Sequence, residues 1–259
     1  MTIRPAGEKD ADQIVALIRQ SFAANMLTAM IYGCRGMESY VRHAISVPET
    51  LADTVYLVAE ADGHIVGCVE LRLMGRTVFL NYICTSAGIR AKGLGRELLY
   101  RSIQMIGPAS YDTMSLDVFH DNLVAVSWYE KLGFVREYST TWWSIPLPAG
   151  KSLAAGRISG LAQADLCQRE FGFSQFTLST ATATYTVGRL GNDWFRISRE
   201  SLLSDDQALA ALSQLEPDRK ILGLFHEDAV LEGIHAPKPF CRSARMTVGL
   251  DLLMHALAA

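Results

Sequence analysis

A short segment between residues 83 and 96 has the residue types that could bind an anion. It reads Ile-Cys-Thr-Ser-Ala-Gly-Ile-Arg-Ala-Lys-Gly-Leu-Gly-Arg, with glycines at Gly88, Gly93 and Gly95 and cations at Arg90, Lys92 and Arg96. Glycine lets backbone N–H groups approach a ligand closely, and the N-terminus of a helix offers unpaired N–H donors and a positive dipole end. If a helix begins near Leu94, the segment is suited to a pyrophosphate.

Two common phosphate-binding motifs do not fit this segment. A P-loop has the pattern G-x-x-x-x-G-K-[ST]; Gly88 and Gly93 have the right spacing, but leucine follows where lysine is required. A dinucleotide-binding fingerprint has the pattern G-x-G-x-x-G, which Gly93 and Gly95 begin and Leu98 interrupts. The pattern that fits is R-x-x-G-x-G, which begins at Arg90.

A second motif lies downstream and comprises residues 116–122, Ala125 and residues 128–134. In this order and spacing the two motifs resemble those of the GNAT superfamily of N-acetyltransferases. Residues 90–95 resemble the loop that binds the pyrophosphate of acetyl-CoA, and the downstream residues resemble the family's later motif. The resemblance covers residues 2–144. It implies the GNAT acyltransferase fold, acetyl-CoA as co-substrate, and transfer of an acetyl or other acyl group to a primary amine.

The resemblance also assigns cofactor-binding positions. The strand that pairs with the pantetheine arm falls at Ile83, Cys84 and Thr85, and the pyrophosphate loop falls at Arg90, Ala91, Lys92, Gly93, Leu94, Gly95 and Arg96. Asn122 occupies the position that commonly bonds the pantetheine region, and Tyr129 that of the tyrosine that protonates the departing CoA thiolate. These two residues are seven apart, about two helical turns, so both can face one cleft.

The family reaction is direct attack of an amine on the thioester, and the amine must be neutral. A free alkylamine resembles lysine, with a pKa of about 10.4, so a carboxylate that removes a proton directly or through water would assist. Asp117 occupies a position where some family members carry an acidic base, and Glu70 is the second candidate. Asp117 could equally be a loop-capping or hydrogen-bonded structural carboxylate, and Tyr129 a packing aromatic.

The elements that position these residues follow from the hydrophobic pattern. Helical spacing and capping signals predict helices over residues 11–23, 37–46, 94–106 and 122–132. Apolar and β-branched runs predict strands over 2–5, 54–61, 64–73, 77–85, 113–118 and 134–144. The order β-α-α-β-β-β-α-β-α-β predicts an α/β fold with a mixed sheet and helices on its faces. We expect this sheet to be complete at Ser144.

The remaining residues predict a second, smaller α/β domain. Residues 144–156 are rich in proline, glycine and small side chains, so we expect a GNAT domain over 1–146 and a C-terminal domain over 147–259. The second half is interpreted as a degenerate copy of the acyltransferase fold without a cofactor loop. It is expected to govern acceptor specificity or formation of a homodimer, and a chain ending near Leu147 to retain donor binding. The alternative to an enzyme is a non-catalytic acyl-CoA-binding module whose C-terminal domain binds a partner.

Composition argues against several other classes. The 259 residues have a net charge of −3 and no basic cluster, which argues against a nucleic-acid partner. No apolar run is long enough for a membrane span and the N-terminus lacks a signal peptide's apolar stretch, so we expect a cytoplasmic protein that acts on a small-molecule or peptide amine. Five scattered cysteines and six dispersed histidines form no ligand pairs, so neither a disulfide framework nor a metal is expected.

Overall fold

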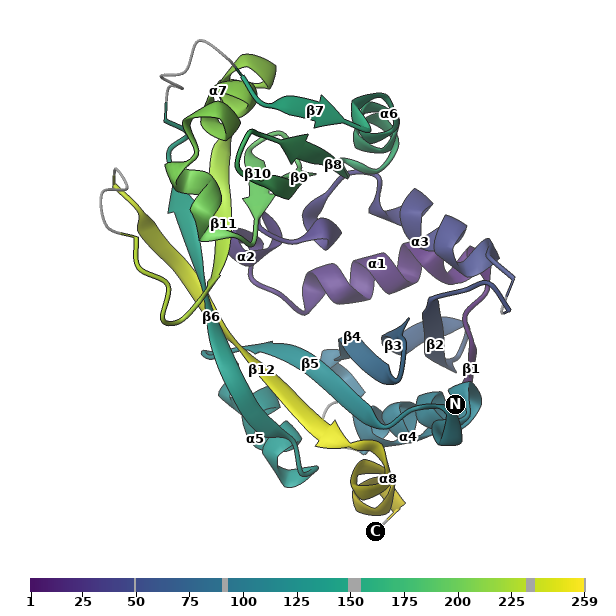
Figure 1. Ribbon diagram of the computed structural model, residues 1–259. Coiled ribbons are helices and arrows are strands. Elements are labelled where there is room, and N and C mark those ends of the chain that lie inside the picture. The colour runs from purple at the N-terminus through teal and green to yellow at the C-terminus, as the bar shows by residue number, and fades with distance from the viewer. Residues whose placement is uncertain (49, 90–92, 149–154, 232–235, 259) are drawn as a thin grey trace. The chain divides into compact units, whose positions relative to one another are not determined.

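The computed structural model describes residues 1–48, 50–89, 93–148, 155–231 and 236–258 (Figure 1). The chain divides into two compact units. The first comprises residues 1–23, 38–138 and 244–259, and the second comprises residues 24–37 and 139–243. This division does not follow the predicted single boundary between residues 146 and 147. The strand β6 (Val135–Ile145) begins in the first unit and ends in the second, and β12 (Lys238–Gly249) begins in the second unit and ends in the first.

The first unit is built on an antiparallel meander. Its strands, which pair in chain order, are β1 (Thr2–Pro5), β2 (Thr54–Ala61), β3 (His64–Met74) and β4 (Thr77–Thr85). Asp62 and Gly63 turn the chain between β2 and β3 with φ of 51° and 79°, the backbone of a tight hairpin turn. The predicted strands over 54–61, 64–73 and 77–85 are confirmed to within one residue.

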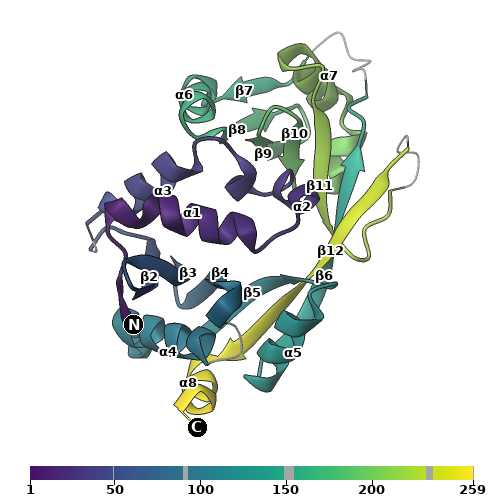
Figure 2. The ribbon, with the colours of Figure 1, turned by 180° about the vertical axis from the view of Figure 1, so that it is seen from behind.

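Helices cover both faces of this meander (Figures 1 and 2). One face carries α1 (Ala11–Gln20) and α3 (Met37–Ser46), and the other carries α4 (Leu94–Ile106). Buried residues of α1 recur at Ile14, Leu17 and Ile18, the spacing of one helix face. On the other side, Leu98 of α4 shares an apolar core with Leu71 of β3. The meander is therefore held between two helical layers.

The last strand of the chain takes part in the first unit. The strand order there is β1-β2-β3-β4-β5-β12-β6, so β12 lies between β5 (Thr113–Phe119) and β6. Ala244, Met246 and Val248 of β12 belong to the core of this unit, and α8 (Leu250–Ala258) follows them and packs on α4. The expectation that the first sheet is complete at Ser144 is therefore wrong, because one of its strands comes from the C-terminal residues.

The second unit repeats the same succession of elements in shortened form. It contains α2 (Ala24–Leu27), β7 (Arg157–Ser159), α6 (Leu161–Phe171), β8 (Phe173–Ser179), β9 (Thr184–Leu190), β10 (Trp194–Ile197), α7 (Asp206–Leu215) and β11 (Lys220–His226). Its strand order is β7-β8-β9-β10-β11-β6-β12, the order of the first unit with β6 and β12 interchanged. This agrees with the interpretation of the second half as a shortened copy.

Short elements complete the description. They are α5 (Leu123–Lys131) and the 3-10 helices η1 (Glu8–Asp10), η2 (Ile31–Gly33), η3 (Ala87–Ile89), η4 (Pro108–Ser110) and η5 (Glu200–Ser204). Within the described ranges, every helix is too short or too polar to cross a lipid bilayer.

Candidate active site

The parallel pair of β4 and β5 is closed at one end and open at the other. Both strands are described throughout, and four residue pairs join them, the last being Leu80 opposite Leu116. Beyond this pair β4 continues to Thr85, still paired with β3 on its other side, and β5 continues to Phe119. The pairing of β4 with β5 therefore ends at Leu80, and residues 81–85 continue as a strand on the β3 side alone. An extended ligand with amide groups could add to β4 as a strand.

A β-bulge lies where the two strands separate. The register of β3 and β4 passes from Leu71 opposite Leu80 to Glu70 opposite Tyr82, so Asn81 is the extra residue. A bulge bends its strand and increases the local twist. The bulge therefore gives a local reason for the departure of β4 from β5.

The predicted cofactor-binding residues of β4 lie along this opening. Cys84 is buried, with 6% of its surface exposed, and Ile83 and Thr85 are half-buried. Cys84 faces Cys68 of β3, and the hydrogen bond between the thiols, together with burial, raises the pKa of Cys68 well above its usual value. The Cys68 thiol therefore stays neutral, and the β4 backbone is the part of this strand that is suited to bind a ligand.

The glycine-bearing loop leads into the N-terminus of α4. Three of its predicted cofactor residues, Arg90, Ala91 and Lys92, lie outside the described residues. Gly93 is the N-cap of α4 with φ of +79°, a conformation that other residues rarely adopt. Because this N-cap has no side chain, the N–H groups of the first turn can bind an anion. Leu94 is buried in the apolar core, and a Cβ at Gly95 would only touch Trp128, at 3.9 Å.

Arg96 uses its guanidinium within the fold. Its Nε donates a hydrogen bond to the carbonyl oxygen of Leu257 at 3.0 Å, and its Nη2 donates one to that of Ala256 at 2.5 Å. These carbonyls end α8, where a positive charge is favoured by the helix dipole. The geometry therefore favours a structural role for Arg96, and a contact with the pyrophosphate stays a prediction.

Tyr129 lies on α5 and is almost fully buried, with 7% of its surface exposed. Burial, and to a lesser extent the nearby Cys84 thiol, raises the pKa of this phenol above its usual value. The ring packs against Phe134, with the two centroids 5.5 Å apart. The phenol therefore stays protonated in the physiological pH range and can donate a hydrogen bond near Cys84.

Asn122 has a structural role at the start of the same helix. It is the N-cap of α5, and its Oδ1 accepts a hydrogen bond from the backbone N–H of Ala125 at 3.2 Å. An asparagine cap satisfies one of the helix's unpaired N–H groups. A contact between the Asn122 amide and a cofactor stays a prediction.

Asp117 lies on β5 beyond the last pair with β4. Its carboxylate accepts two hydrogen bonds from Arg245 of β12, from Nε at 2.6 Å and from Nη2 at 2.9 Å. The same guanidinium lies over the ring of Phe79, 5.0 Å from its centroid. A bidentate ion pair of this kind engages both carboxylate oxygens. The geometry favours a structural role for Asp117, and action as a base would require this ion pair to open.

Glu70 is the better placed of the two predicted bases. It lies on β3 at the bulge with 1% of its surface exposed, and the Nδ2 of Asn81 donates a hydrogen bond to its Oε1 at 2.5 Å. The Nε of Arg72 lies 3.6 Å from the same oxygen. A buried carboxylate needs such partners to remain charged. Because it is buried, Glu70 would reach an amine in the opening through water.

The matched family has the chemistry that this geometry suggests. Residues 28–134 match the family model described as the acetyltransferase (GNAT) family. Residues 28–134 therefore belong to a GNAT acetyltransferase domain. The matched residues include the opened strand pair, the glycine-bearing loop and the whole downstream motif. GNAT acetyltransferases use acetyl-CoA as the acyl donor, and no curated protein matches the sequence.

Solved structures extend the likeness of the fold beyond the GNAT domain. A tandem GNAT protein from the clavulanic acid biosynthesis pathway, solved without AcCoA, has a TM-score of 0.67 at 13% identity, over 96% of this chain and 98% of that chain. A GCN5-related N-acetyltransferase from Sphaerobacter thermophilus has a TM-score of 0.59 at 14% identity, over 96% of this chain and 95% of that chain. At these identities the likeness shows the fold alone, and it covers both units.

The region of the second unit that corresponds to the donor opening of the GNAT domain is closed. β10 and β11, both fully described, are paired along all four residues of β10, as far as Ile197 opposite Gly223. The next α-helix, α7, is capped by Asp205, whose Oδ1 accepts hydrogen bonds from the N–H groups of Gln207 and Ala208 at 3.1 Å each. The protein's own carboxylate therefore occupies this helix N-terminus.

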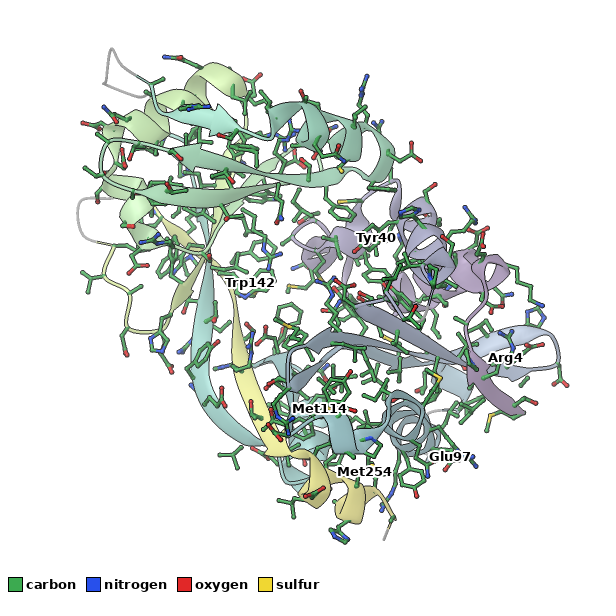
Figure 3. All side chains as sticks on the ribbon, turned by 45° about the vertical axis from the view of Figure 1, so that its right-hand side comes forward. Arg4, Tyr40, Glu97, Met114, Trp142 and Met254 are labelled. Atoms are coloured by element: carbon green, nitrogen blue, oxygen red, sulfur yellow. The ribbon has the colours of Figure 1, made fainter. Side chains whose placement is uncertain are left out.

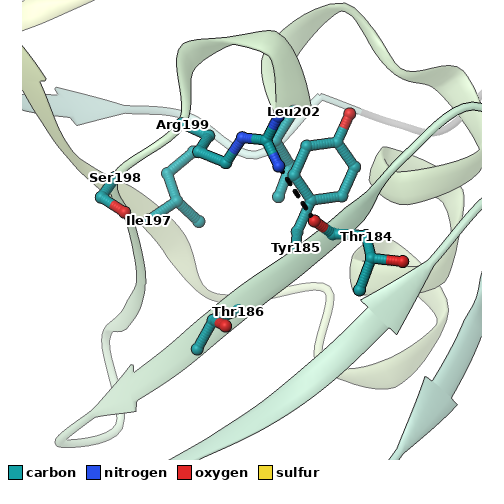
Figure 4. A pocket seen from close by; sticks show the side chains of 7 residues that line it. All are labelled: Thr184, Tyr185, Thr186, Ile197, Ser198, Arg199 and Leu202. Atoms are coloured by element: carbon teal, nitrogen blue, oxygen red, sulfur yellow. Dashed lines mark hydrogen bonds between the residues drawn. The ribbon is translucent and has the colours of Figure 1, made fainter.

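A small pocket lies beside this closed pair (Figure 4). Its volume is about 160 Å³, and Arg199 crosses it with its guanidinium 5.7 Å from the centroid of the Tyr185 ring. The Nη1 of Arg199 donates a hydrogen bond to the carbonyl oxygen of Thr184 at 3.2 Å. Ligand pockets usually measure about 300–1,000 Å³. This pocket is therefore smaller than a usual ligand pocket, and a second pocket of about 540 Å³ adjoins it at Tyr185 and Arg199 and extends to Asp205.

Sequence reasoning missed three residues that shape the GNAT site. Asn81 forms the bulge, Arg72 lies beside Glu70, and Arg245 holds Asp117. A bulge leaves no local pattern in a single sequence, and Arg245 is 128 residues from its partner. In the part of the chain that the structure describes, no group of three or more His, Cys, Asp and Glu side chains is arranged to hold a metal ion.

Proposed function

We propose that the protein is an N-acetyltransferase that transfers the acetyl group of acetyl-CoA to a primary amine by direct attack. The observation that carries this proposal is the separation of β4 from β5 at the Asn81 bulge, followed along the chain by the α4 N-terminus at Gly93. The opening offers backbone partners for the amides of pantetheine, and the helix N-terminus offers N–H donors for the pyrophosphate. The match to the GNAT family supports the same donor.

The proposed donor site combines the two segments. The backbone of Ile83, Cys84 and Thr85 would pair with the pantetheine arm, and the loop formed by Arg90, Ala91, Lys92, Gly93, Leu94 and Gly95 would surround the pyrophosphate. The core position of Leu94 and the positive φ of Gly93 mean that these two residues would contribute backbone N–H groups and no side-chain contact. Longer acyl donors would use the same two segments.

Glu70 is proposed to accept the proton that the acceptor must lose. An alkylammonium with a pKa of about 10.4 is charged at neutral pH and cannot attack a carbonyl carbon. Glu70 would take one proton through a water molecule, and the neutral amine would then form the C–N bond. As the C–S bond breaks, the electron pair goes to sulfur and the second amine proton goes to solvent.

Tyr129 is proposed to stabilise the departing thiolate. A thiol has a pKa of about 8.5 and tyrosine one of about 10, and burial raises the pKa of Tyr129 further. Complete proton transfer from the phenol to sulfur is therefore uphill. The main contribution of Tyr129 would be a hydrogen bond to the negative charge that develops on sulfur, while solvent supplies the proton of the free thiol.

We propose that the second unit serves the acceptor or a homodimer contact and binds no donor. The full pairing of β10 and the Asp205 cap on α7 support this proposal, because they close the two features on which the donor site depends. Light scattering on the intact chain tests the dimer, which should give twice the monomer mass.

Calorimetry and a CoA-release assay with primary amines test the proposed reaction together. We expect acetyl-CoA to bind with a Kd of about 1 μM, or about −8 kcal/mol, and CoA release to require an amine.

The pH dependence of turnover tests the proposed base. Glu70→Gln should lower turnover roughly 10²-fold and remove the acidic limb of the pH–rate profile, whereas Asp117→Asn should keep that limb. Binding without turnover would support a non-catalytic module, and absence of binding would refute the proposal.

A further inference from the structure

Glu70 and Arg72 form a charged pair on one face of the meander. They are two residues apart on β3, so their side chains leave the sheet on the same side. Tyr56 of β2 and Tyr82 of β4 are the cross-strand partners of Glu70 and share this face. Tyr40 of α3, labelled in Figure 3, belongs to the same cluster, because its charge interactions are with Arg72 and Glu70.

The guanidinium of Arg72 is incompletely bonded. Its Nε is buried and, among the described residues, has no hydrogen-bond partner, since Oε1 of Glu70 lies at 3.6 Å. The side chain is 38% exposed, so its outer nitrogens can be reached from solvent. Arg245, in contrast, makes two hydrogen bonds to one carboxylate. A guanidinium has five donors in a fork that matches a carboxylate, and the outer nitrogens of Arg72 are available for such a contact.

The surroundings of Arg72 keep it charged. Burial alone would lower the pKa of Arg72, but Glu70 and the hydroxyls of Tyr40, Tyr56 and Tyr82 outweigh burial and raise it. Burial also raises the pKa of Tyr40, whose hydroxyl therefore stays neutral. The cluster thus presents a carboxylate and a guanidinium side by side, at the bulge where the donor opening begins.

We infer that Arg72 binds a carboxylate of the acceptor, and that the acceptor is an amino acid with a free α-amino group and a free α-carboxylate. This inference rests on the proposed function, in which Glu70 receives the proton of the same amine. Because Arg72 and Glu70 lie side by side, with Nε 3.6 Å from Oε1, a ligand that binds the outer nitrogens of Arg72 and reaches Glu70 through water must carry opposite charges close together. An α-amino acid carries its ammonium and its carboxylate on one carbon.

This inference is tested by measuring the rate of CoA release with acceptors that differ only in the carboxyl group. Each of several amino acids is compared with its carboxamide and with the amine that lacks the carboxyl group, at fixed acetyl-CoA. The free acid should have a kcat/KM about 30-fold higher than either analogue, because a charge-assisted bidentate contact is lost in both. The comparison uses the intact chain, so it does not depend on the folding of a variant.

Substitutions of Arg72 add a second readout. Arg72→Gln should lower kcat/KM about 30-fold for the free acids and leave the carboxamides within about twofold, while Arg72→Lys should restore part of the preference. Acetyl-CoA affinity should not change. Arg76→Gln is the matched control, because Arg76 lies at the exposed turn of the same meander, paired with Asp112.

The outcomes separate this inference from the function on which it rests. Equal rates for the free acid and its two analogues, or an equal loss for all three in Arg72→Gln, would overturn the inference and leave acetyl transfer established. Arg72 would then only balance the charge of Glu70. Absence of acetyl-CoA binding, or of CoA release with any amine, would refute the proposed function and this inference with it.

Discussion

The two units have the same strand order but differ where a donor would bind. In the first, β4 runs beyond its last pair with β5, whereas in the second, β10 ends together with its pairing to β11. The next α-helix has Gly93 as its N-cap in the first unit, whereas in the second its N-cap is Asp205, whose carboxylate accepts hydrogen bonds from the first N–H groups. A cofactor site on this topology therefore depends on the length of one strand and the type of one capping residue.

Arg189 of the second unit and Arg72 of the first differ in how their guanidinium groups are bonded. Arg189 of the second unit donates hydrogen bonds to Asp165 at 2.8 Å and to Glu216 at 2.9 Å, and lies over the ring of Phe176. Arg72 of the first unit has no comparable partner among the described residues. A buried guanidinium with two carboxylates is a structural element, whereas one that is incompletely bonded near an opening is suited to bind a ligand.

The largest effect is expected from removal of the residues after Leu147. This truncation deletes Met246, Val248, Leu250 and Leu253, which are buried in the core of the first unit. Each contributes roughly 1.5–3 kcal/mol, so the loss is comparable to the whole stability of a typical domain. Contrary to the expectation from the sequence, the truncated chain should show no cooperative melting by circular dichroism. Cooperative melting together with acetyl-CoA binding would show that β12 is dispensable.

Substitution of Gly93 tests whether the open N-terminus of α4 accounts for acetyl-CoA binding by the first unit. Gly93→Val should weaken acetyl-CoA binding by roughly 10²-fold in calorimetry, because a side chain would cover the N–H groups of the first turn of α4. Gly75→Val is the matched control, since both glycines have positive φ and open space around the missing Cβ. Both variants place a side chain at a positive φ, but only Gly93→Val should lose affinity. An equal loss in the two would assign the effect to strain.

The smallest effect is expected from substitution of Tyr129, for which the buried Tyr185 of the second unit is the control. Tyr129→Phe should lower kcat by roughly 10- to 100-fold with little change in acetyl-CoA affinity. Tyr185→Phe, in the closed region of the second unit, should leave kcat unchanged. Because the pKa of Tyr129 is raised, its phenol loses its proton only above pH 10, so wild-type turnover should show no fall due to Tyr129 below that pH. Full turnover in Tyr129→Phe would assign the residue to packing.

The features that could be predicted from the sequence are those set by residues close together in the chain. The hairpin turns and the amphipathic helices depend on neighbouring residues, and the structure has them at the expected positions. The insertion of β12 depends on contacts such as the one between Asp117 and Arg245, which are 128 residues apart. For the same reason Arg96 fits the loop motif in the sequence, whereas in the structure it donates to the carbonyls that end α8.

The central claim is that one unit binds acetyl-CoA and the other does not, and amide hydrogen exchange tests it most directly. Exchange is measured on the intact chain with and without saturating acetyl-CoA. The account predicts slower exchange on binding for the N–H groups of residues 81–85 and 93–97, where β4 leaves β5 and α4 begins. It predicts no change in residues 194–208, where β10 is paired and Asp205 caps α7. Protection in the second region, or binding that protects neither, would contradict it.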